Sequence, residues 1–185
     1  MDFSRGEAPQ TAEMVAALPK VWIGYLLSLA SFIALAIHFY ENPGIADGNP
    51  FTPPLYLFLP AFVTLVYWFV CVYRLHVVLK HAPGWKHPIS PARAAGFHFI
   101  PIYCIYWLYK WPTEVAKFVD WRLQRDALSP VRAGLFVFFS YAACVLLGPG
   151  GLLLMFLSLS YLTEWVRRAL LSPPRSFGEA VHSSE

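Results

Sequence analysis

A run of twenty residues without a formal charge, VWIGYLLSLASFIALAIHFY from Val21 to Tyr40, constrains the fold of this chain more than any other feature. About 20 apolar residues are what a helix needs to cross the hydrocarbon core of a bilayer. A second run, Leu55 to Tyr73, follows a loop rich in proline, glycine and asparagine. Only 14% of the 185 residues are charged, against roughly 25% in soluble domains. These features predict an all-α integral membrane protein, with helices at about 21–40 and 55–73.

The C-terminal half contains two more apolar runs, 130–147 and 151–171, on either side of the sequence GPGG. Proline and several glycines together are a strong helix stop, and Pro149 lies within this one. Each run is long enough to span a bilayer at about 1.5 Å per residue. We therefore expect a hairpin of two spanning helices. The expected boundaries are a polar tail or surface helix at 1–18, a single membrane domain at 19–171 and a polar tail at 172–185.

The stretch RAAGFHFIPIYCIYWLYKWP, from Arg93 to Pro112, is apolar but interrupted. Its most apolar part, Ala94 to Trp107, has only fourteen residues. Gly96 and Pro101 weaken its helix, and Pro101 removes one backbone hydrogen bond. A carbonyl freed in this way is costly in lipid, so such a break is tolerated mainly where protein surrounds it. We expect a broken or re-entrant segment at 94–110, packed inside the bundle, with a tilted or kinked full span as the alternative.

The next segment has the character of an amphipathic helix. Pro112 suits the first turn of a helix, and apolar and basic residues then alternate at helical spacing. A helix at 112–125 with this mixture can lie in the membrane interface while Lys117 and Arg122 extend toward water. A solvent-exposed connecting helix is the alternative.

The 14 lysines and arginines avoid two of the connecting segments. None lies in 41–54 or in GPGG, whereas four lie in 74–93 and five in 110–132. Cytoplasmic loops collect Lys and Arg. All basic residues are cytoplasmic if four runs span and 94–110 enters and leaves on the same side. The pattern predicts a multi-pass protein of the bacterial inner membrane with both termini in the cytoplasm: four transmembrane helices, one short broken or re-entrant segment and one interfacial amphipathic helix.

Three short motifs resemble those of a bacterial membrane family, the one labelled domain of unknown function 4328. They are YR at 73–74, SPARAAGFHFIP at 90–101 and WPTEV at 111–115. The chain departs from the family pattern at Cys71, where a tryptophan is expected, and at His98, which replaces one of two aromatic residues. The resemblance implies two further apolar helices after these motifs. It implies no activity, because the family has none to transfer.

Histidines are the candidate cofactor ligands of the chain. His76 and His98 are expected on the same side of the membrane, where a pair could ligate a haem or one could hold a chlorophyll magnesium. In the alternative interpretation His38 and His76 lie in the interface, and His98 bonds a backbone carbonyl freed near Pro101. We predict no bound cofactor, with haem or chlorophyll as possibilities, and no metal site. The three dispersed cysteines do not indicate a disulfide framework.

The basic residues near the expected cytoplasmic surface are candidate contacts for anionic lipid headgroups or for a partner protein. Simple anchoring of the topology is the alternative. These candidates are Arg74, Lys80, Lys86, Arg93, Lys117 and Arg122. Four further residues are expected to shape the backbone, namely Gly96, Pro101, Pro112 and Pro149.

No nucleotide-binding, hydrolase or metalloprotease motif occurs in the sequence. The apolar runs carry no Asp, Glu, Lys or Arg away from their ends, which argues against ion-driven transport. We expect a non-enzymatic accessory or partner-binding subunit of a membrane complex, with lipids and other membrane proteins as partners and no nucleic acid. The alternatives are a haem- or chlorophyll-binding subunit of a redox or photosynthetic complex, and a small-solute or lipid transporter.

Overall fold

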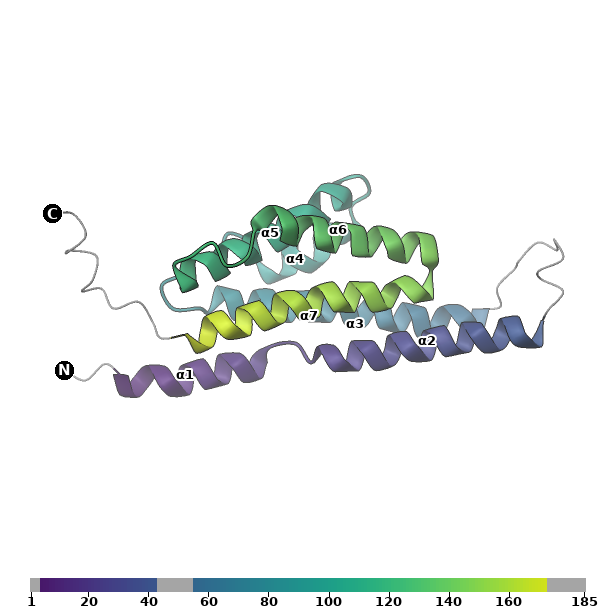
Figure 1. The fold of residues 1–185 in the computed structure, drawn as a ribbon, viewed down its shortest axis with the longest axis horizontal. Helices are drawn as coiled ribbons and strands as arrows, with labels where there is room; N and C mark the ends of the chain where they lie inside the picture. Colours follow the sequence, from purple (N-terminus) through teal and green to yellow (C-terminus); the bar gives the residue numbers. More distant parts are fainter. Residues whose placement is uncertain (1–3, 43–54, 173–185) are drawn as a thin grey trace.

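The computed structural model describes residues 4–42 and 55–172, with side chains from Gln10 onward. The described residues are helical, with no β-strand among them (Figure 1). The helices are α1 (Ser4–Ala17), α2 (Val21–Glu41), α3 (Leu55–Lys80), α4 (Pro91–Gly96), the 3₁₀ helix η2 (Phe97–Phe99), α5 (Tyr103–Leu123), α6 (Pro130–Leu147) and α7 (Pro149–Leu171). The expected polar tail at 172–185 and nearly all of the 41–54 loop lie outside the described residues.

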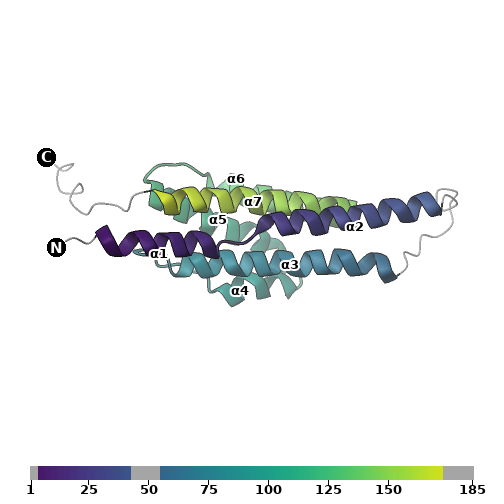
Figure 2. The same ribbon diagram turned by 90° about the horizontal axis from the view of Figure 1, so that it is seen from below.

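Five long helices, α2, α3, α5, α6 and α7, form the body of the protein. Helix α2 packs against α3 and α7, and α6 packs against α7 and α5. In both views α2 and α3 run in opposite directions, and the start of α1 lies at the same end of the bundle as the end of α7 (Figures 1 and 2). Residues 1–18, expected to be a tail or surface helix, contain helix α1.

The predicted hairpin in the C-terminal half is present, although α6 and not α7 is among the helices long and apolar enough to cross a membrane. Gly148 alone separates α6 from α7, and its φ of 57° is one that a residue with a side chain rarely adopts. Helix α7 begins at Pro149, earlier than expected, because proline is well tolerated in a first helical turn. The two helices approach closely next to this turn. A side-chain carbon at Gly151 would lie 2.5 Å from the carbonyl oxygen of Ala143.

Three helical stretches are long and apolar enough to cross a membrane. They are Gln10–Glu41, Tyr56–Lys80 and Pro130–Leu147. Large apolar side chains are exposed along α2, α3, α6 and α7 and around the start of α5. Such a surface is unfavourable in water and favourable in lipid. The molecule is therefore an all-helical protein with the composition of a membrane protein, as the sequence predicts.

The segment before α5 is broken at Pro101, one of the two residues that the sequence indicates, but the turn is not packed inside the bundle, because Ile100 and Ile102 are exposed. Gly96 ends α4 with an ordinary helical φ of −68°, and η2 continues directly from it. The change of direction comes at Ile100–Ile102, where Ile102 has a φ of 65°. Pro101 lies inside this turn, so it does interrupt the helix.

Helix α5 runs through Pro112 instead of starting there, which corrects the expected boundary. The face expected to lie in the membrane interface is also buried, because Trp111, Val115 and Phe118 have no exposed surface. Burial on both sides of the proline stabilises the helix despite the lost hydrogen bond. The amphipathic pattern arises because Lys117 is exposed on the opposite side.

Replacing Gly151 with alanine should destabilise the α6–α7 hairpin, because the added methyl group meets the backbone of α6. Overpacking of this kind costs roughly 1–3 kcal/mol. We expect a lower midpoint of thermal unfolding in detergent. Gly150→Ala is the matched control, since its nearest atom lies 4.0 Å away on Phe32. Equal midpoints for the two variants would contradict the close approach.

Candidate functional site

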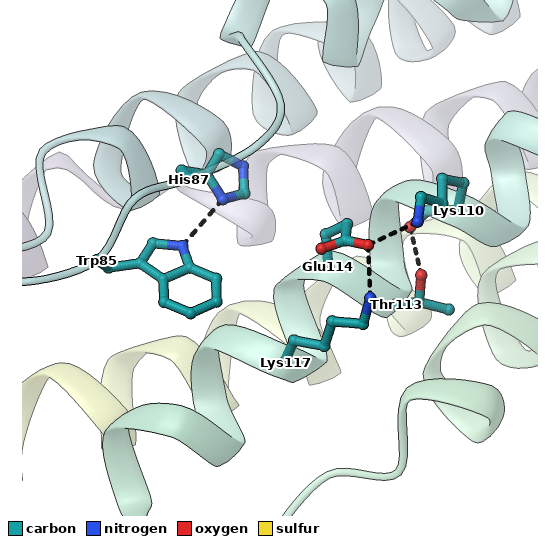
Figure 3. Close-up of polar contacts among 6 residues, drawn as sticks. All are labelled: Trp85, His87, Lys110, Thr113, Glu114 and Lys117. Carbon is teal, nitrogen blue, oxygen red and sulfur yellow. Dashed lines mark hydrogen bonds and ion pairs between the residues drawn. The ribbon is translucent and has the colours of Figure 1, made fainter.

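A chain of three hydrogen-bonded rings joins the loop after α3 to the interior. The indole nitrogen of Trp85 donates to Nδ1 of His87 over 3.1 Å (Figure 3). Nε2 of His87 lies 2.7 Å from Nδ1 of His76. Trp85 can only donate, so a neutral His87 must carry its proton on Nε2 and donate it to His76. His76 therefore carries its own proton on Nε2, which faces the interior.

Burial keeps His87 neutral and so maintains this chain. Desolvation lowers the pKa of His87 to about 4, although the negative charge of Glu114 acts in the opposite direction. His76 has no exposed surface. The ring of His76 is thus enclosed by protein, and its expected place at the depth of the membrane interface stays a prediction. His38, also expected there, is 8% exposed and lies 2.9 Å from the hydroxyl of Tyr56.

His98 lies in η2 and bonds a backbone carbonyl, as the alternative interpretation expects, although this carbonyl belongs to Ala95 and is not one that Pro101 frees. Its Nδ1 lies 3.1 Å from the carbonyl oxygen of Ala95. A carbonyl only accepts, so Nδ1 is the protonated nitrogen and Nε2 presents a lone pair. The ring stands at 86° to that of Trp68, with 5.1 Å between the centroids. His98 therefore fastens η2 to α3.

Four aromatic rings enclose the centre of the molecule. The ring of Trp111 lies 5.7 Å from that of His76, 6.2 Å from that of Trp68 and 6.5 Å from that of His98. One ring nitrogen of each of the four is buried and has no hydrogen-bond partner among the described residues. With the tautomers derived above, three of these nitrogens are donors and one is an acceptor.

The two candidate haem ligands are not equivalent. Ligation of a haem iron by two histidines requires a lone pair on each. His98 presents one, but Nε2 of His76 carries a proton, and moving that proton would break the hydrogen bond from Trp85 to His87. The geometry therefore argues against a haem that both histidines ligate together. The described residues contain no group of three potential metal ligands.

The basic residues divide by what they contact. Arg74, Lys80, Lys86 and Arg93 are exposed. Arg122 instead donates from Nε to the carbonyl oxygen of Ala169 over 3.3 Å, and from its terminal nitrogen to that of Ser172 over 3.4 Å. Arg122 thus joins α5 to the end of α7. Its side chain has this structural role rather than the expected contact with lipid.

Glu114 is a buried carboxylate that the sequence analysis missed. One oxygen accepts from Lys110 over 2.7 Å and from Lys117 over 2.8 Å (Figure 3). Desolvation raises the pKa of Glu114, but the two lysines outweigh it and lower the pKa overall. The signal was in the sequence, because the lysines stand four residues before and three after the glutamate.

Glu114 and Lys110 also line a cavity of about 220 Å³ between the loop after α3, the helix α4 and the helix α5. Arg93 lines it from α4, together with the rings of Phe97 and Trp107. The indole nitrogen of Trp107 donates to the carbonyl oxygen of Ala94 over 2.9 Å, which ties the two walls together. We name this the basic cavity. Of the basic residues predicted to contact lipid or a partner, Arg93 lines the basic cavity, and Lys117 lies beside it through its bond to Glu114.

A second cavity, of about 430 Å³, is apolar and was not predicted. We name it the apolar groove. It is lined by Leu35, Leu57, Phe58, Ala61, Phe62, Leu65, Cys144, Gly148, Pro149 and Leu152. These residues come from α2, α3, α6, α7 and the turn between the last two, segments that no local pattern in the sequence connects.

No family model, curated protein or solved structure matches this chain. The resemblance to domain of unknown function 4328 therefore stays a prediction. The function must be argued from the groove, the basic cavity and the buried rings themselves.

Acid should destabilise the protein through His87. Its pKa in the folded protein, about 4, is below the ordinary 6.5, so the unfolded chain binds a proton first as the pH falls. The stability that depends on neutral His87 is present above pH 6.5 and declines between pH 6.5 and 4. His87→Gln should flatten this part of the thermal stability profile, because glutamine stays neutral.

His81→Gln is the control, since His81 is exposed in the same loop and bonds only the backbone of Val77. It should keep the pH dependence of the unmodified protein. If the His87→Gln variant keeps the same pH dependence of thermal stability, the three hydrogen-bonded rings do not depend on a neutral His87.

Proposed function

We propose that this chain is a non-enzymatic protein of the bacterial inner membrane that binds a transmembrane helix of a partner subunit in the apolar groove. The observation that carries the proposal is the groove itself. It has a volume of about 430 Å³ and is lined almost wholly by apolar side chains. A volume in the range of about 300–1,000 Å³ is typical of binding sites, and this one faces a region that only lipid or another helix can occupy.

The groove exists because α5 does not cover it. Helices α3 and α7 line the groove with α6, and α6 packs elsewhere against α5. The turn before α5 reaches only as far as Trp68 and Phe69 of α3, since His98 and Phe99 contact these rings at 5.1 and 4.8 Å. None of the residues that line the groove comes from the α4–α5 segment.

A helix is a better occupant than a lipid chain because of the shape of the groove lining. Ala61 and Gly148 are small, and Cys144 is only slightly larger. Small residues let helix backbones approach closely, which is how helices associate where no hydrophobic drive operates. Phe58 and Phe62 beside them supply a large contact area. The groove thus has the small and large residues of a helix-packing surface.

The proposal includes a topology in which α2, α3, α6 and α7 span the bilayer and α4–η2–α5 enters and leaves on the cytoplasmic side. Phe99 contacts Phe69, which lies about 8 Å deeper along α3 than Arg74 at 1.5 Å per residue. Arg122, near the other end of α5, bonds the end of α7. The turn thus lies beside the middle of α3, while the end of the segment is tied to the end of α7, which carries Arg167 and Arg168. These basic residues favour the cytoplasm for that end and for both termini.

Single-cysteine labelling tests this topology. With Cys71, Cys104 and Cys144 replaced, Gln124→Cys should not react with an impermeant thiol reagent added to intact cells, because residue 124 is exposed on the cytoplasmic side. Glu41→Cys, exposed at the opposite end of α2, is the control and should react. Reaction at position 124 would show that the segment spans, and that the proposed topology is wrong.

Photo-crosslinking in native membranes tests the groove. A photoreactive phenylalanine analogue at Phe62, which lines the groove and is 63% exposed, should give one reproducible protein adduct. The same analogue at Phe139, 62% exposed on α6 and outside the groove, should give lipid adducts only.

The adduct at Phe62 should disappear when Ala61→Trp fills the groove, and remain when the exposed Ala30 of α2 is changed to Trp. Lipid adducts alone at Phe62, or equal protein adducts at both phenylalanines, would contradict the proposal.

A further inference from the structure

The basic cavity combines positive charge with a wall of aromatic rings. Arg93 and Lys110 line it from α4 and α5, and Phe97 and Trp107 form one side, with 4.8 Å between their ring centroids. At about 220 Å³ it is large enough for a small polar group rather than a drug-sized molecule. The hydrogen bond from Trp107 to Ala94 holds the two helices at this separation.

The charges around the cavity do not cancel. Glu114 is the acidic residue in its lining, and its carboxylate is already shared by Lys110 and Lys117. The lining thus has two cations, Arg93 and Lys110, for one anion, and Lys117 beside the cavity adds a third positive charge on the same carboxylate. Arg93 is exposed, and no carboxylate among the described residues forms an ion pair with it. A guanidinium and an ammonium at one cavity are well suited to a phosphate group.

The surface beside the cavity indicates whether the phosphate is a free ion or part of a lipid. The turn and first helical residues that follow Phe97 expose large apolar side chains, namely Phe99, Ile100, Ile102, Tyr103, Ile105 and Tyr106. A free phosphate ion cannot cover these apolar side chains, whereas the acyl chains of a lipid can. Basic pockets between membrane helices on the cytoplasmic side are typical sites for anionic lipid headgroups.

We propose that Arg93 and Lys110 bind the phosphate of an anionic phospholipid in the basic cavity, with the acyl chains lying along the exposed apolar turn before α5. The lipid would hold the turn against the bilayer from outside, while His98 fastens it to α3 from inside. This proposal uses a different surface from the apolar groove, and it does not depend on a partner helix.

Native mass spectrometry of the full chain in detergent, with added phosphatidylglycerol, tests the site. A basic residue next to an anionic lipid contributes roughly fivefold in affinity. Arg93→Gln should therefore weaken binding about fivefold, and the double variant with Lys110→Gln about 25-fold. Arg93 makes no side-chain contact that the fold needs, so the single variant should keep the thermal midpoint of the unmodified protein.

Arg125→Gln is the matched control, because Arg125 is exposed in the α5–α6 loop and lines neither cavity. It should bind phosphatidylglycerol like the unmodified protein. Phosphatidylcholine, which has no net charge, should bind more weakly, and millimolar inorganic phosphate should not displace the lipid. Equal losses for Arg93→Gln and Arg125→Gln would overturn the proposal, as would equal binding of both lipids. Displacement by inorganic phosphate would assign the cavity to a free anion.

Discussion

The packing of His98 and Trp111 against Trp68 is the interaction on which the rest of the architecture depends. It holds the turn at Ile100–Ile102 against the middle of α3. The rings of Trp68 and Phe69 contact His98 and Phe99 directly before the turn, whereas Ile100 and Ile102 in the turn itself are exposed. Helix α5 then starts beside the middle of α3 and ends beside the end of α7, where Arg122 bonds the carbonyl oxygen of Ala169.

The two cavities differ in the elements that line them. The apolar groove is lined by α2, α3, α6 and α7 and by no residue of the α4–α5 segment. The basic cavity lies between α4 and α5, which the hydrogen bond from Trp107 to Ala94 joins. The lining of the groove is apolar, whereas that of the basic cavity carries Arg93 and Lys110, so the two proposals name different partners.

Features set by local chemistry could be predicted from the sequence, and those set by distant contacts could not. The hairpin at Pro149 was predictable because a proline and glycines stop a helix wherever they occur. The continuity of α5 through Pro112 was not, since it depends on burial against other helices. The same limit applies to His76. Its basic surroundings in sequence do not indicate that the loop carrying His87 and Trp85 folds over it. The groove draws on residues more than ninety positions apart.

The ring chain explains why a buried polar cluster is compatible with this fold. Each hydrogen bond from Trp85 to His87 and from His87 to His76 has only one allowed direction once the neutral tautomers are set. If the loop shifted along α3, two donor nitrogens or two acceptor nitrogens of these rings would face each other. One of these buried groups would then be left without a hydrogen bond. Such a group costs about 1–3 kcal/mol, whereas apolar contacts tolerate small slides. The histidines therefore fix the position of the loop, and with it the Pro88–Ile89 wall of the basic cavity.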